Sequence, residues 1–99
     1  MYFITTLERL PSDNVYDCGA MRCVGYYDTF EAAETTVVNN NCDICEYLYN
    51  YCVIEKIEQG LYRYALEGDR WFYKYNFEGT YDKIEEPEEF KHIAGFALG

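Results

Sequence analysis

Residues 21–41, MRCVGYYDTFEAAETTVVNNN, set the architecture of this chain, because their pattern changes from that of a strand to that of a helix. Met21–Tyr27 predicts a strand, in which Gly25 marks a bulge or a close approach of two backbones. The pattern changes at Asp28, and the residues after it predict one main helix over about residues 29–39. The other elements are placed around this strand and helix.

Both ends of the predicted helix carry sequence signals. Asp28 and Glu31 have the spacing of a capping box, in which the first residue accepts a backbone hydrogen bond at the helix start. The asparagines of residues 39–41 predict the end, because asparagine tolerates the left-handed conformation that closes a helix. Three apolar residues at i, i+3 and i+7 predict the buried face: Phe30, Ala33 and Val37.

Five further stretches predict strands from their β-branched and aromatic residues. These stretches are Tyr2–Leu7, Tyr51–Glu58, Arg70–Asn76, Tyr81–Glu85 and His92–Leu98. Residues 8–20 predict a loop or a long hairpin connection, and Pro87 predicts the start of a short helical turn near residues 87–91. Residues 42–50 fit either a turn of helix or an irregular strand entry.

Together these elements predict a single α+β domain over residues 1–99. We expect a mostly antiparallel sheet of about five to six strands, with the main helix packed on one face. Short turns between several of the strands favour the antiparallel pairing.

The charge of the chain limits its partners. It carries 18 Asp and Glu against 8 Lys and Arg, a net charge of −10. Such a surface repels nucleic acid and anionic membranes and attracts a basic protein surface. The alternative is that the acidic residues serve only to keep the protein soluble. Five carboxylates predict the interaction face: Asp28, Glu31, Glu34, Asp43 and Glu46.

Two further observations concern location. No apolar run approaches the roughly 20 residues that a membrane span requires. The first residues lack the basic start and long apolar middle of a secretory signal, so we expect a cytoplasmic location.

The cysteines raise the question of a metal or redox site. Cys42 and Cys45 form a CxxC pair, and His92 is the single imidazole in the chain, so these three are the candidate metal ligands. The negative charges of Asp43 and Glu46 beside this pair argue against a reactive thiolate. Free cysteines that pack as small apolar side chains are the favoured alternative. No phosphate loop, dinucleotide fingerprint or zincin motif occurs, so we expect no cofactor, no catalytic residue and no enzymatic activity.

Aromatic residues make up 19% of the chain, and this content excludes ordinary disorder. The predicted aromatic platform consists of Tyr47, Tyr49, Tyr51, Trp71, Tyr73 and Tyr75. It fits a subunit contact in a homodimer, or a stacking site for a small cyclic nucleotide beside Arg22, Arg63 or Arg70. Packing in the core and in a dimer contact is the simpler alternative.

Three segments resemble a group of small uncharacterised proteins from Firmicutes and their phages or mobile elements. They are RCVGYYDTFEAAE (22–34), YNYCVIEKIEQGLY (49–62) and EEFKHIAGF (88–96). The resemblance implies no catalytic residues, but it implies an accessory or counter-defence role. The leading hypothesis is therefore an inhibitor, of anti-CRISPR or anti-restriction type, that occupies a basic nucleic-acid-binding surface. The alternatives are a nucleotide-signal sponge and a structural or interaction domain.

Overall fold

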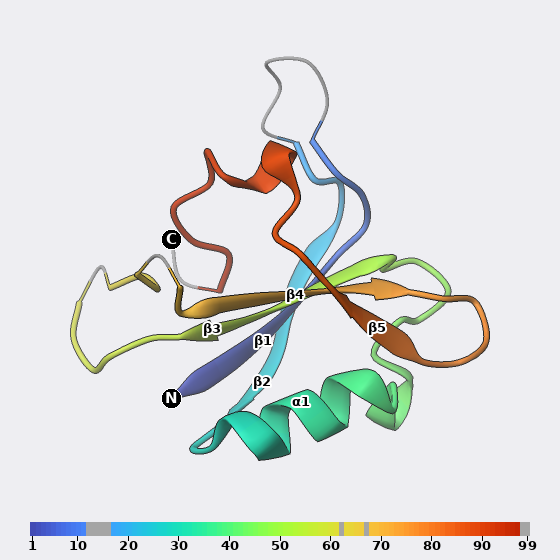
Figure 1. Ribbon diagram of the computed structural model, residues 1–99, viewed down its shortest axis with the longest axis horizontal. Coiled ribbons are helices and arrows are strands. Elements are labelled where there is room, and N and C mark those ends of the chain that lie inside the picture. Colours follow the sequence, from blue (N-terminus) through green and yellow to red (C-terminus); the bar gives the residue numbers. More distant parts are fainter. Residues whose placement is uncertain (12–16, 62, 67, 98–99) are drawn as a thin grey trace.

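The computed structural model describes residues 1–11, 17–61, 63–66 and 68–97. Within them, five strands form one antiparallel sheet in the order β2-β1-β3-β4-β5, and one α-helix lies along one face (Figure 1). The strands are β1 Tyr2–Leu7, β2 Met21–Tyr27, β3 Tyr51–Lys56, β4 Arg70–Tyr75 and β5 Tyr81–Ile84. The helices are α1 Phe30–Val38 and two short 3-10 helices, η1 Asn41–Asp43 and η2 Glu88–Phe90. The predicted α+β fold is confirmed.

β1 lies between β2 and β3, and its pairing with β2 contains the predicted bulge. Ile4 pairs with Gly25, but the next residue, Thr5, pairs with Cys23, so Val24 is the extra residue. A bulge of this kind bends its strand and increases the local twist. The prediction from Gly25 is confirmed.

The connection between β1 and β2 continues their pairing. Beyond the strands, the amide of Glu8 donates to the carbonyl of Ala20 at 2.9 Å, and that of Arg9 donates to Cys18 at 3.0 Å. The predicted connection over residues 8–20 is thus a hairpin extension where it is described, and its residues 12–16 lie outside the described part.

Helix α1 packs on the sheet through the predicted face. Ala33 and Val37 are fully buried, and they pack into a core that β1, β3, β4 and β5 also supply. The predicted cap at Asp28 is wrong, because Thr29 is the residue whose hydroxyl accepts the amide of Ala32, at 3.2 Å. Asp28 lies one residue too early to reach this first turn. At the other end Asn40 adopts the left-handed conformation that the asparagine run predicted.

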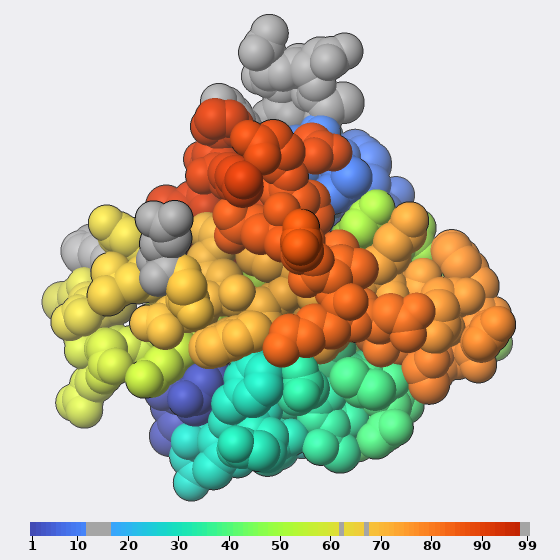
Figure 2. Space-filling model, viewed as in Figure 1, coloured from blue at the N-terminus to red at the C-terminus, as the bar shows by residue number. Residues whose placement is uncertain are grey.

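Residues 85–97, here called the C-terminal strap, cover the opposite face of the sheet (Figure 1). Phe90 and Phe96 are buried against Phe72 of β4, with ring centroids 5.5 and 6.0 Å away. In the space-filling view the strap, orange to red, lies above β4, and α1 lies below it (Figure 2). The predicted strand His92–Leu98 is wrong, since its described residues are irregular and none of them is in a strand. Their apolar side chains cover the sheet instead of extending it.

Candidate docking surface

β2 is an exposed edge of the sheet. Its residues pair with β1 alone. Within the described residues, the one hydrogen bond that their backbone makes outside that ladder also comes from β1, where the hydroxyl of Thr6 donates to the carbonyl of Arg22 at 3.2 Å. The opposite edge, β5, is four residues long and presents exposed Asp82 and Lys83, features that discourage further pairing. β2 is seven residues long and contains no carboxylate. The bulge at Val24 partly protects this edge, but the length and low charge of β2 leave it the edge better suited to accept another strand.

The side chains of β2 are also open to solvent. Met21, Tyr26 and Tyr27 are 48%, 60% and 39% exposed, which is high for large apolar side chains. The hydroxyl of Tyr27 accepts a hydrogen bond from Thr36 of α1 at 2.9 Å, so this end of the edge is held against the helix. Exposed tyrosines on a rigid element are typical of protein interfaces.

The segment after α1 borders this edge in a strained conformation. Five of its non-glycine residues have positive φ: Asn40, Cys42, Asp43, Glu46 and Tyr47. Asn40 and Asp43 tolerate this conformation, whereas each of the other three costs roughly 1–2 kcal/mol relative to the right-handed region. The side chain of Asn40 holds the segment in place, because its Oδ1 accepts the amide of Cys45 at 2.9 Å and its Nδ2 donates to Asp43 at 3.3 Å. Residues 41–48 therefore form the short helix η1 followed by turns, not a strand entry.

Two hollows lie where this segment meets β2. The first, of about 470 Å³, is lined from β2 by Arg22, Cys23 and Val24 and from the segment by Cys42, Asp43 and Glu46, with Ile44. The second, of about 270 Å³, is lined mainly by Ile4, Val24, Tyr26, Tyr27, Thr36 and Ile44. Since Val24, Cys42 and Ile44 line both, the hollows are neighbours along β2. We name β2, these hollows and the carboxylates around them the β2 edge surface.

The structure brings four of the five predicted interaction-face residues to this surface. Asp43 and Glu46 line the first hollow, with Glu46 3.5 Å from the guanidinium of Arg22. Asp28 directly follows β2, and Glu31 lies in the first turn of α1. Both are exposed, and neither makes an ion pair with a described residue. The carboxylates therefore flank both ends of the edge.

Glu34, the fifth, lies elsewhere. It accepts a hydrogen bond from the hydroxyl of Tyr73 at 2.6 Å and lies 3.6 Å from the ammonium of Lys83. Burial and the Glu34 carboxylate raise the pKa of Tyr73, which keeps this phenol protonated. Glu34 thus joins the helix to the sheet.

The candidate metal ligands are separated by their environments. Cys42 is exposed at the first hollow, Cys45 is buried in the core beneath α1, and His92 is exposed on the strap. In the described part of the chain, no group of three or more Cys, His, Asp or Glu side chains is arranged to hold a metal ion.

The six residues of the predicted aromatic platform do not form one surface. Tyr49 and Tyr73 are buried, and Trp71 and Tyr75 pack against the core beneath α1. Tyr51 packs on the opposite, strap side of the sheet, and Tyr47 is fully exposed. Sequence reasoning missed Tyr26 and Tyr27 as surface aromatics. No local signal marked them, since β4 also contains no carboxylate and its Phe72 and Tyr73 are buried.

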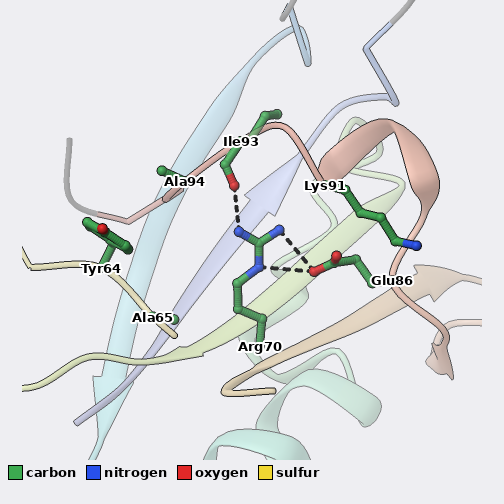
Figure 3. Close-up of a pocket in the computed structure, with 7 residues that line it drawn as sticks. All are labelled: Tyr64, Ala65, Arg70, Glu86, Lys91, Ile93 and Ala94. Carbon is green, nitrogen blue, oxygen red and sulfur yellow. Dashed lines mark hydrogen bonds and ion pairs between the residues drawn. The ribbon is translucent and has the colours of Figure 1, made fainter. Parts of the chain in front are cut away.

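A third hollow, of about 360 Å³, lies under the strap (Figure 3). The guanidinium of Arg70 points into it and donates to Glu86 at 3.1 Å, to the carbonyl of Ile93 at 2.5 Å and to that of Phe90 at 3.1 Å. These bonds use most of the five guanidinium donors. Lys91, which also lines the hollow, pairs with Glu88 at 2.8 Å. This site holds the strap in place and leaves little of Arg70 for a ligand.

No protein-family model, curated protein or solved structure matches this chain. Within the described residues, no helix combines the length and apolar character that crossing a membrane requires.

Proposed function

We propose that this chain is a non-enzymatic acidic binding protein that docks on a basic surface of a partner protein through the β2 edge surface. One observation carries the proposal: an unpaired sheet edge with exposed tyrosines and no carboxylate is flanked at both ends by carboxylates. An apolar centre with a charged rim is the usual anatomy of a protein interface. The sign of the rim favours a partner rich in Lys and Arg.

The partner class that fits best is a nucleic-acid-binding effector. Such proteins present Lys and Arg clusters that bind phosphates, and carboxylates on a rigid scaffold compete for the same cations. The chain would then act as an inhibitor by occupying the binding surface, as an anti-CRISPR or anti-restriction protein does, in the cytoplasm. The net charge of −10 supports long-range attraction to such a surface.

Displacement of DNA tests this function. We would titrate the chain into complexes of a labelled duplex with purified CRISPR and restriction nucleases and follow fluorescence anisotropy. The expected result is displacement from at least one effector, with an affinity that falls steeply between about 50 and about 200 mM salt, as charge-driven binding does. Failure to displace DNA from any basic effector at low salt contradicts the proposal.

Matched charge variants locate the surface. One triple variant removes three charges at the β2 edge surface and combines Asp28→Asn, Glu31→Gln and Asp43→Asn. The control is a second triple variant, which removes three exposed charges from the segments around and beyond β5 and combines Glu78→Gln, Glu85→Gln and Glu89→Gln. Exposed charge pairs are worth about 0.2–1 kcal/mol each, so the first variant should weaken binding threefold or more. The control should change it by less than about twofold, since such distant charges are largely screened.

A further inference from the structure

The two hollows beside β2 are spaced for alternate side chains of an added strand. The first hollow spans Arg22 to Val24 of β2, and the second spans Val24 to Tyr27. Their centres are therefore separated by about two to three residues. Val24, the extra residue of the bulge, adds little rise, so the separation is roughly 5–7 Å. In an extended chain, residues i and i+2 project on the same side about 7 Å apart.

Both hollows also open on one side of the sheet. Val24 packs against the core beneath α1, and Tyr27 is bonded to Thr36 of that helix. The first hollow is completed by η1 and the residues after it, which follow α1 in the chain. A strand paired with β2 would direct every second side chain toward this side.

The linings of the hollows differ in chemistry. The first contains Asp43 and Glu46, and because Arg22 pairs with Glu46, Asp43 remains as a carboxylate without a cation among the described residues. The second is lined mostly by apolar and aromatic residues, Ile4, Val24 and Tyr27 among them, whereas the ring of Tyr26 packs on Phe3 on the other face of the sheet. The first hollow thus fits a Lys or Arg side chain, and the second fits an aliphatic one.

We propose that the β2 edge surface binds an extended segment of its partner as a sixth strand, with a Lys or Arg and an aliphatic residue at positions i and i+2 in the two hollows. This inference rests on the proposed function and names the form of the partner segment. Backbone hydrogen bonds to β2 supply affinity, and the two hollows supply selectivity.

Short peptides test this arrangement. The probes are acetyl-Thr-Lys-Thr-Val-Thr-Thr-amide and acetyl-Thr-Val-Thr-Lys-Thr-Thr-amide, since the added strand can run in either direction. The controls carry Glu in place of Lys, or Asp in place of Val. Titration into ¹⁵N-labelled protein, followed by NMR, should shift amides of Met21–Tyr27, and one Lys peptide should bind at least fivefold more tightly than its Glu control.

The variant Asp43→Asn tests the first hollow. Asp43 has a φ of 52°, a left-handed conformation that asparagine tolerates, and the new amide oxygen can still accept the bond from Asn40. The variant should therefore fold normally and bind the Lys peptide about two- to fivefold more weakly, the value of one exposed ion pair. The matched variant Glu89→Gln should bind it unchanged.

Several results overturn the inference. These are equal binding of the Lys and Glu peptides, shifts confined to other elements, and no binding at millimolar peptide. The inference is also overturned if a second copy of the chain occupies this edge. In that case the β2 amides are protected from exchange in the free protein and lose this protection on dilution.

The failure of strand addition can be told apart from the failure of the proposed function. If an effector loses its DNA to this chain but the peptides leave β2 unshifted, the proposed function stands and strand addition fails. If the peptides bind at β2 but no effector loses its DNA, strand addition stands and the proposed inhibition fails.

Discussion

Glu55 anchors the C-terminal strap, and its replacement should separate the loss of a hydrogen-bond acceptor from the loss of a buried charge. Its side chain lies in the middle of the sheet, fully buried, and accepts the amides of Phe96 at 3.2 Å and Ala97 at 2.9 Å. Burial raises the pKa of this carboxyl, and the two amides and Arg70 offset part of that effect. The folded site therefore favours a neutral group that can still accept a hydrogen bond.

The two replacements of Glu55 should lower the free energy of unfolding by different amounts. Glu55→Ala leaves two strap amides without an acceptor, at about 1–2 kcal/mol each, so we expect the free energy of unfolding to fall by about 2–4 kcal/mol. Glu55→Gln keeps the shape and one acceptor oxygen and removes the buried charge, so it should stay within about 1 kcal/mol of the wild type at pH 7.

Urea denaturation measures both values, and native-state hydrogen exchange at Phe96 and Ala97 shows whether the strap is the part affected. These two amides should lose protection in Glu55→Ala and keep most of it in Glu55→Gln. Equal stability of the two variants, or unchanged exchange at both amides in Glu55→Ala, would refute the anchoring role.

Three further predictions concern the helix cap, the core and pH. Thr29→Ala should lower the free energy of unfolding by about 1 kcal/mol through loss of the cap, and Asp28→Asn should lower it less. Tyr81→Phe should cost about 1–3 kcal/mol, because the buried hydroxyl donates to a backbone carbonyl at 2.6 Å, whereas Tyr47→Phe, at a fully exposed site, should cost nothing measurable in the same urea titration. The raised pKa of Glu55 means that the folded chain binds more protons than the unfolded one, so this group lowers stability as pH rises above its ordinary value of 4.5. Glu55→Gln should therefore gain stability relative to the wild type as pH is raised from about 4 toward 7.

Local sequence patterns were sufficient for most of the fold. The strands Tyr2–Leu7 and Met21–Tyr27 have the predicted bounds, and the strands that begin at Tyr51, Arg70 and Tyr81 end one or two residues early. These stretches owe their pattern to side chains that must be buried on a pleated surface, and that requirement is visible in each stretch by itself.

The strap could not be predicted in this way. Residues 92–98 contain apolar side chains at strand-like density, and a segment that covers a sheet needs the same residues as one that extends it. The difference depends on Glu55 and Arg70, distant in sequence, which bind the backbone of the strap. Partners so far apart leave no local signal.

The candidate site was predicted in part. The surplus of carboxylates pointed to Asp28, Glu31, Asp43 and Glu46, which the fold gathers around β2. The sequence could not show that β2 is an edge, because strand order is a tertiary property. The sequence pattern also assigned Glu34 to the same face, which is wrong. Tyr73 and Lys83, which hold Glu34 at the helix–sheet contact, lie in strands far along the chain and leave no signal near Glu34.

Hydrogen exchange measures which surface of the chain the partner covers. The sample is the chain bound to an effector from which it displaces DNA. Amides of Met21–Tyr27 whose N–H groups point away from β1 are unpaired within the described residues and should exchange rapidly in the free chain and slowly in the complex. Protection that appears on the strap or on β5, with β2 exchanging as fast as before, would contradict docking at the β2 edge surface.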